Sequence, residues 1–276
     1  MSTKHDLFDL AAMPFAWFFH RANRVNVRLA AKADPIYEAV TIFGKLKLHC
    51  PTALSLWRAK TLTTKEPDTI KWINSFGPDT VLYDVGANVG LYSLYAALTG
   101  AQVVSFEPEA QNYALLNRNI HANALQNKIT ALNIALCDAN RISHLHLSRF
   151  EVAGAMHNFD EPVDYNKQPF VPEFKQGVMG ARLDDLIKKF DLPRPTHIKI
   201  DVDGCERAVI DGAIESLTDL RLKSVLIEIN DALSADLELL KILENIGYRM
   251  VSRLRSPLFF ESSSYASVYN YIYERP

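Results

Sequence analysis

Several features that define whole classes of proteins are scarce in this sequence. Its 276 residues include only three cysteines, Cys50, Cys137 and Cys205, and no two have the C-x-x-C spacing of a zinc site. A disulfide framework is excluded, and a reducing, cytoplasmic location is expected. The 30 basic side chains nearly balance the 32 acidic ones, so the charge does not indicate a nucleic-acid partner.

Long apolar runs are also missing. The longest, at residues 10–19, has about half of the ~20 residues that a membrane-spanning helix needs. Asp6 and Asp9 stand where a secretory signal peptide carries basic residues. We therefore expect neither an integral membrane protein nor a signal peptide.

The chain does contain 48% hydrophobic residues, enough for a full-sized core. An N-terminal extension is expected at 1–65, with amphipathic helices followed by a hairpin at 37–50. The main domain is expected at 66–276, where strand-like and helix-like segments alternate. A proline-containing stretch at about 140–180 interrupts this alternation, and such long loops are typical of lids and binding segments.

The alternation predicts an α/β fold, a mostly parallel sheet with helices on both faces. The expected strands lie at residues 81–85, 102–106, 129–136, 197–202, 224–229, 248–254 and 267–273. The expected helices lie at residues 91–98, 110–122, 183–190, 206–212 and 234–245, with one more beginning at residue 67.

Residues 1–32 combine an aromatic stripe, including Phe15, Trp17 and Phe18, with five basic side chains against two acidic ones. One interpretation is an interfacial helix in peripheral contact with an anionic membrane. The other is that the aromatic side chains pack on the main domain as a lid or form a homodimer contact. The second is preferred, because Phe and Trp are as common in cores and interfaces as at membranes.

The most informative segment is the loop after the strand at 81–85. Asp84 ends the strand, and a turn of the form D-x-G-x-N-x-G runs through Gly86, Asn88 and Gly90 into a helix. Small residues let a ligand approach the backbone, and the helix start offers free N–H groups. A dinucleotide fingerprint would need glycine at positions 88 and 91, and the G-K-[ST] of a phosphate loop is absent from this segment.

Glu107 ends the next strand, about twenty residues beyond the first glycine, where a carboxylate can bind both hydroxyls of a ribose. A ligand with a ribose, an ammonium group and no phosphate is S-adenosylmethionine, the expected cofactor. Asp84 is expected near its amino-acid moiety, directly or through the loop. Asp138, in the turn after the third strand, is placed to accept from the adenine amino group, and a solvated cap is the alternative.

A second group of carboxylates follows two later strands. Asp201 and Asp203 come at the end of one and Glu228 near the end of the next. Parallel strands bring their carboxyl ends to one edge, so these side chains should face the same crevice as Glu107. We expect a general base for methyl transfer to a hydroxyl, with Asp201 as first choice, Asp203 as second and Glu228 as third. A divalent metal is the alternative, without a ligand-loop spacing to support it, and a capping role stays open for each.

At these residues the sequence resembles the FkbM family of S-adenosylmethionine-dependent methyltransferases. The resemblance runs from about Glu66 to Arg253. It is carried, in order, by DVGANVGLYS, FEPE, LLNRNIHAN, ALCD, RLDDL, KIDVDGCE and LIEIN. It implies a class I methyltransferase fold, Rossmann-like with a seven-stranded sheet, and methyl transfer to a hydroxyl of a sugar or natural product.

By position, the resemblance implies an acidic strand end at Asp201 and a cofactor site at Asp84, Gly86, Asn88, Gly90, Glu107 and Asp138. Where the family has glutamate in K-I-D-x-E-G, this chain has the shorter Asp203, which affects the acceptor geometry more than cofactor binding.

The expected function is therefore S-adenosylmethionine-dependent methylation of a hydroxyl oxygen on a small-molecule, sugar or glycolipid acceptor. Two other classes stay open. A nicotinamide-dependent oxidoreductase is disfavoured by Asn88 and Leu91 in the loop. A non-catalytic membrane-surface or partner-binding protein on a methyltransferase scaffold is disfavoured by the nearly complete motif set. No motif identifies the acceptor.

Overall fold

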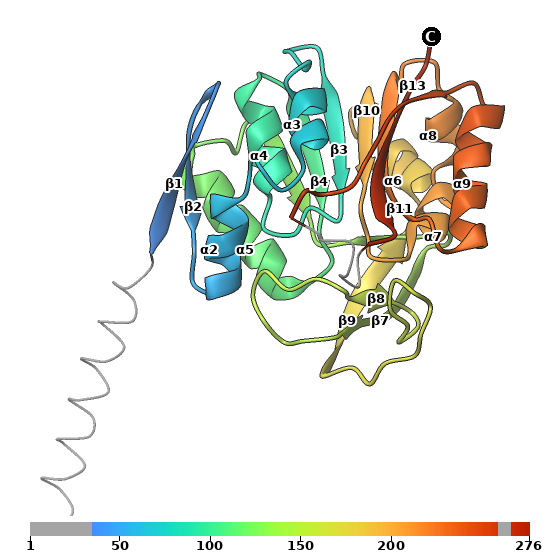
Figure 1. Ribbon diagram of the computed structural model, residues 1–276, viewed down its shortest axis with the longest axis horizontal. Coiled ribbons are helices and arrows are strands. Elements are labelled where there is room, and N and C mark those ends of the chain that lie inside the picture. Colours follow the sequence, from blue (N-terminus) through green and yellow to red (C-terminus); the bar gives the residue numbers. More distant parts are fainter. Residues whose placement is uncertain (1–34, 259–265) are drawn as a thin grey trace, which may run out of the picture. The chain divides into compact units, whose positions relative to one another are not determined.

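A seven-stranded sheet runs through the part of the chain that the computed structural model describes, residues 35–258 and 266–276 (Figure 1). Its strands are β3 (Val81–Val85), β4 (Gln102–Phe106), β5 (Ile129–Leu132), β10 (His197–Ile200), β11 (Ser224–Asn230), β12 (Arg249–Leu254) and β13 (Val268–Glu274). They lie in the order β12-β13-β11-β10-β3-β4-β5. β13 runs antiparallel to the other six strands, which all point in one direction. The predicted seven-stranded, mostly parallel sheet is confirmed.

Helices cover both faces of this sheet. One face carries α3 (Pro67–Ile73), α4 (Leu91–Leu98) and α5 (Ala110–Ala122), and the other carries α6 (Leu183–Phe190), α7 (Glu206–Asp211), α8 (Ile214–Thr218) and α9 (Ser234–Asn245). Successive side chains of a strand point to opposite faces of the sheet, so the core is divided into two parts. Leu82 packs with α3 and α4, while Tyr83 and Val85 pack with α6 and α7. The predicted Rossmann-like architecture is confirmed.

The hairpin expected at residues 37–50 is present as β1 (Ile36–Thr41) and β2 (Gly44–His49). Its inward-facing Leu46 and Leu48 are buried. Asn119 on α5 and Asn123, the C-cap residue of that helix, accept hydrogen bonds from the β2 backbone at 2.8 Å. The next helix, α2 (Ala53–Lys60), was not predicted. Its capping box pairs Thr52 with Ser55 rather than with the glutamate or glutamine that marks such a start in a sequence. The predicted domain boundary at residues 65 and 66 stays a prediction.

The interrupting stretch forms most of a second sheet, of four strands in the order β6-β9-β7-β8. These strands are β6 (Ala135–Leu136), β7 (Arg141–Leu147), β8 (Asn158–Phe159) and β9 (Phe174–Ala181). The single strand expected at 129–136 is therefore two strands, because the chain leaves β4 after Leu132 and pairs with β9 from Ala135 on. Figure 1 shows this second sheet below the main sheet.

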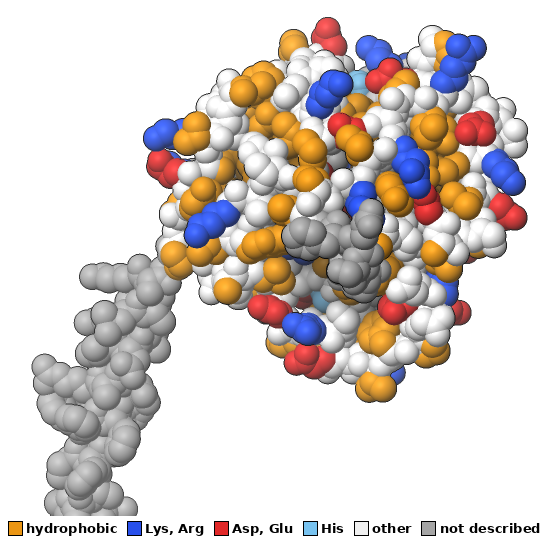
Figure 2. Space-filling view, viewed as in Figure 1, with side chains coloured by type: hydrophobic (Ala, Val, Ile, Leu, Met, Phe, Trp, Pro, Cys, Tyr) orange, Lys and Arg blue, Asp and Glu red, His pale blue; other side chains and the backbone are white. Residues whose placement is uncertain are grey.

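Two of the sequence predictions concern contact with a membrane. None of the helices in the described ranges is long and apolar enough to cross a membrane. On the face shown in Figure 2, basic and acidic side chains are interspersed. The two interpretations of residues 1–32 lie outside the described residues.

The buried β11 offers a test of the core. Leu226 is fully buried, whereas Leu220 in the preceding turn is 83% exposed. We expect Leu226→Ala to lower the free energy of unfolding by about 2–5 kcal/mol, because it removes buried methyl groups and leaves a cavity. Leu220→Ala, the matched control, should change it by less than about 0.5 kcal/mol. Urea unfolding measures both, and equal effects would contradict this description of the core.

Candidate functional site

The loop between β3 and α4 lies against β10 at the carboxyl edge of the sheet. The N–H groups of Gly86 and Ala87 both donate to the Phe106 carbonyl oxygen at 3.0 Å. Gly86 has a φ of +80°, and a Cβ there would lie 1.8 Å from the carbonyl oxygen of Asp201. Only glycine fits this position, and its lack of a side chain brings the loop and the acidic strand end together.

Glu107 lies buried beneath the loop. Its two carboxylate oxygens accept hydrogen bonds from the N–H of Asn88 at 2.7 Å and from the N–H of Glu109 at 2.9 Å. Burial raises the pKa of Glu107 to about 8, against the lowering effect of these two bonds. The carboxylate is thus held in one orientation by the backbone on both sides.

A cavity of about 590 Å³ opens beside Glu107. Part of its lining is apolar: Val85, Phe106, Pro108, Ile134, Leu136, Leu145 and Phe159. Polar groups come from Asn88, Glu107, Asn112, His157, Asp201 and Asp203. An apolar cavity with a few convergent polar groups is typical of a small-molecule site, and a carboxylate beside an apolar wall suits a nucleoside.

One wall of this cavity comes from the loop between β7 and β8. The side-chain amides of Asn88 and Asn112 donate to the Gly154 carbonyl oxygen at 2.6 and 3.1 Å. Asn112 also accepts from the N–H of Ala153 at 2.7 Å. The second sheet is therefore attached to the glycine loop itself, and Gly154, Ala155 and His157 line the cavity because of it.

Three of the six predicted cofactor residues, Gly86, Asn88 and Glu107, line the cavity. Asp84 lies behind the loop, where it is 1% exposed and accepts from the Ser93 hydroxyl at 2.5 Å. Its other carboxylate oxygen is buried and has no hydrogen-bond partner among the described residues. Of the two predicted modes of action, direct or through the loop, this position agrees with the second.

Gly90 and Asp138 are outside the cavity lining. A Cβ on Gly90 would lie 2.2 Å from a methyl carbon of Leu116, so this glycine lets α4 and α5 pack closely. Asp138 is exposed, and its carboxylate pairs with Arg141 at 2.8 Å. The cofactor roles given to these two residues stay predictions.

The sequence prediction missed Asn112, Gly154 and His157. Asn112 lies within a helix with no distinguishing pattern, and the other two lie in the interrupting stretch. The only signal for them was the length of that stretch, because their placement depends on hydrogen bonds between segments far apart in the chain.

A buried ammonium group lies under the acidic strand ends. The Nζ of Lys199 is 2.6 Å from an Asp201 carboxylate oxygen and 5.3 Å from the centre of the Tyr92 ring, and the side chain is 2% exposed. Burial lowers the pKa of Lys199, but the charges of Asp201, Asp84 and Glu66 outweigh it and raise the pKa above its usual range. The ammonium therefore stays charged and stabilises negative charge on all three carboxylates.

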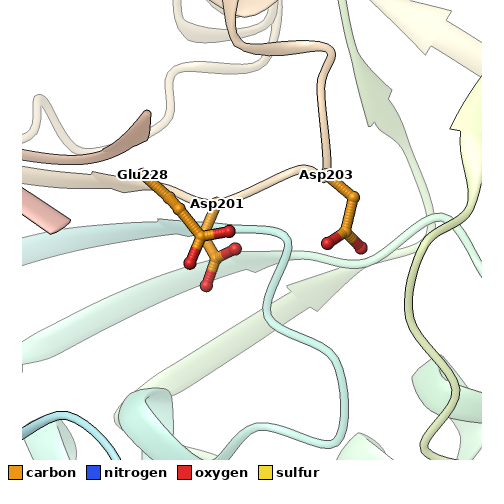
Figure 3. Close-up of side chains that lie close together, drawn as sticks. All are labelled: Asp201, Asp203 and Glu228. Atoms are coloured by element: carbon orange, nitrogen blue, oxygen red, sulfur yellow. The ribbon is translucent and has the colours of Figure 1, made fainter. Parts of the chain in front are cut away.

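Asp201, Asp203 and Glu228 lie close together, as predicted from the strand ends (Figure 3). Each offers a carboxylate oxygen within 4.8 Å of those of the other two. Burial, and next the charge of Asp201, raises the pKa of Glu228 well above its usual range and also that of Asp203. Burial and repulsion between the carboxylates thus favour the protonated forms of both Glu228 and Asp203. Such a group can accept a proton or hold a divalent cation.

Asp203 occupies the position at which the resembled family has glutamate. It adopts a φ of +55°, a left-handed conformation in which aspartate is enriched. Its carboxylate accepts from the N–H of Met156 at 2.6 Å, so the short side chain also holds the loop after β7.

A second, larger hollow of about 1510 Å³ adjoins the cavity. It shares Asp201 and Asp203 with the cavity, and its other walls come from α2 and the loop after β7. The side chains that line these walls include Leu54, Trp57, Arg58, Lys65, Arg149, Glu151 and Met156. We call it the cleft. The two hollows meet at the carboxylates, where a reaction between their two occupants would take place.

Comparison with known proteins places this site in a family. A family model described as the methyltransferase FkbM domain matches residues 84–250. The chain is 26% identical over 206 residues to 31-O-demethyl-FK506 methyltransferase FkbM from Streptomyces tacrolimicus, covering 66% of this chain and 77% of that protein. It is 23% identical over 176 residues to hexuronic acid methyltransferase AglP from Haloferax volcanii, covering 63% and 66%.

Among solved structures, precorrin-6y C5,15-methyltransferase from Geobacter metallireducens matches with 15% identity and a TM-score of 0.45, covering 76% of this chain and 87% of that chain. The class I methyltransferase fold implied by the resemblance agrees with the strand order and with the family match.

His157 offers a test of the cavity wall. Both of its ring nitrogens are buried and have no hydrogen-bond partner within the described ranges. Burial, and next the charge of Arg58, lowers the pKa of His157 to about 4. An unfolded histidine titrates near 6.5, so the unfolded chain binds the extra proton between these values. The stability that the buried, uncharged ring contributes is fully present above about pH 6.5 and is lost as the pH falls toward 4.

We therefore expect His157→Asn to gain unfolding free energy relative to the unmodified protein as the pH is lowered from 7 to 4.5. The exposed His144 provides the matched control, and His144→Asn should show no such change. Urea unfolding at the two pH values measures both differences, and parallel curves for His157→Asn would show that this ring is not buried uncharged.

Proposed function

The chain belongs to the FkbM family of methyltransferases, and we propose that it transfers the methyl group of S-adenosylmethionine to a hydroxyl oxygen of a small-molecule, sugar or glycolipid acceptor. The observation that carries the proposal is the meeting of the cavity beside Glu107 and the cleft at Asp201 and Asp203. The names of the two relatives, one for 31-O-demethyl-FK506 and one for a hexuronic acid, support a hydroxylated acceptor.

The residues around the cavity fit this cofactor. Glu107 offers its carboxylate to the ribose hydroxyls, and the apolar lining, including Phe106 and Leu136, suits the adenine ring. Gly86 and Asn88 present the loop to the amino-acid end. When bound, the cofactor supplies a methyl group that its sulfonium charge already activates. What remains for the protein is to orient the acceptor hydroxyl and to accept its proton.

Asp201 is the proposed base. Its ion pair with Lys199 stabilises its charged form, while Glu228 favours its proton. We therefore assign the base to Asp201, which would take the proton from the acceptor oxygen as the bond between that oxygen and the methyl carbon forms and the bond between that carbon and the sulfonium sulfur breaks. Glu228 and Asp203 orient the acceptor through hydrogen bonds.

Cofactor binding is the first test. Saturating S-adenosylhomocysteine should raise the melting temperature, since a ligand at 100 times its Kd adds about 2.7 kcal/mol of stability. Glu107→Gln and Glu107→Ala should lose most of this shift, because Gln replaces one of the two carboxyl oxygens that face the ribose hydroxyls by an amide N–H₂ and Ala removes both. Glu238→Ala, an exposed change on α9, should keep it. No shift in the unmodified protein would favour the non-catalytic scaffold.

The base is tested by Asp201→Asn, which keeps the shape of the side chain and removes its charge. We expect kcat to fall by about 10²- to 10⁴-fold while the melting shift with S-adenosylhomocysteine is retained. Asp211→Asn on the exposed face of α7 is the matched control. Transfer of labelled methyl groups to an acceptor found by screening hydroxylated compounds measures both. Loss of activity with a chelator, restored by Mg²⁺, would instead indicate the metal alternative.

A further inference from the structure

The cleft contains a guanidinium group that forms no ion pair with any described residue. Arg58, in the last turn of α2, lines the cleft and is only partly exposed. Its Nε donates to the Ala153 carbonyl oxygen at 2.8 Å, which fixes the guanidinium over the loop after β7. Within residues 35–258 and 266–276, no carboxylate forms an ion pair with it. The charge of Arg58 acts on Asp203, but its terminal nitrogens form no ion pair with a described residue, so they are available to an occupant of the cleft.

The other charges of the cleft are largely accounted for. Lys65 pairs with Glu66 at 2.7 Å, and Asp201 pairs with Lys199. Asp203 accepts from a backbone N–H, and burial keeps the proton on Glu228.

Three charged groups remain that the described part of the chain does not pair: Arg58, the exposed Arg149 and the partly exposed Glu151. Two of these three are guanidinium groups, one on α2 and one in the loop after β7. They give the cleft two cationic groups that no carboxylate of the described residues pairs, and an anionic group on the occupant could neutralise them.

A guanidinium presents a rigid fork of N–H donors that matches the two oxygens of a carboxylate or phosphate. Because one nitrogen of Arg58 is held by Ala153, its terminal nitrogens are already oriented, and less entropy is lost when they bind. A neutral hydroxyl could accept one such bond but would leave the charge unbalanced.

We propose that the methyl acceptor is an anion, with a carboxylate or phosphate group that Arg58 binds while the hydroxyl to be methylated faces Asp201. Arg149, at the exposed side of the cleft, attracts the same group during approach. The inference rests on the proposed methyl transfer and narrows its acceptor to acidic hydroxylated compounds.

The probes are three compounds that differ mainly in charge: glucose, glucuronate and glucose 6-phosphate. Their binding to the protein saturated with S-adenosylhomocysteine is measured by ligand-observed NMR. At least one acidic compound should bind about tenfold more tightly than glucose, the usual scale of a charge-assisted hydrogen-bonded pair. The better of the two identifies carboxylate or phosphate as the group. Equal affinities, or no binding of either acidic compound, would overturn the proposal.

Variants test whether the Arg58 side chain causes the preference for the acidic compound. Arg58→Gln should remove the preference for the acidic compound, and Arg58→Lys, which keeps the charge but loses the Nε bond to Ala153, should keep part of it. Arg207→Gln, an exposed arginine on α7 paired with Asp211, should keep all of it. An unchanged preference in Arg58→Gln would overturn the proposal.

The melting shift with S-adenosylhomocysteine separates this inference from the proposed function. Its retention in both Arg58 variants shows that their fold and cofactor cavity are intact. If the unmodified protein shows no shift, the proposed function fails. If it shows the shift and methylates neutral and acidic sugars equally, only the anionic acceptor is wrong.

Discussion

The buried ammonium of Lys199 is the interaction on which the site depends. Lys199 lies on β10, the central strand between β11 and β3, directly beside Asp84 in the parallel register. Its charge stabilises Asp84, Asp201 and Glu66, which come from β3, the end of β10 and the start of α3. Without it, several buried carboxylates would face one another uncompensated, which costs several kcal/mol for each broken buried pair. The acidic edge can exist inside the core because one cation lies beneath it.

The glycine loop depends on this edge in turn. Gly86 can lie against the Asp201 backbone only because it has no side chain. The backbone of Asn88 then holds Glu107, while its side chain holds Gly154. One short turn therefore positions the carboxylate for the ribose and also attaches the second sheet that closes the cavity. The interrupting stretch acts as a wall of the site, and the chemistry of the cofactor pocket and the shape of the cleft are coupled through it.

Charge separates the two hollows. The cavity side has the buried carboxylate of Glu107 and an apolar lining, which suit a nucleoside. The cleft side has Arg58 on α2 and Arg149 in the loop after β7. Between them lies a carboxylate cluster in which Glu228 favours its proton and Asp201 its charge. A near-zero net charge for the whole chain therefore conceals strong local fields, which decide where a sulfonium, a hydroxyl and an anion would each be bound.

The sequence by itself determined the main sheet, the bounds of α4, α5, α6 and α9, and the meeting of acidic strand ends at one edge. Each of these follows from periodicity between near neighbours and from the parallel direction of the strands. Tertiary structure alone decided that Gly90 packs on Leu116 and that His157 and Arg58 face the two hollows. The placement of His157 and Arg58 depends on hydrogen bonds across 66 and 95 positions of the chain, and no local pattern encodes a partner so far away.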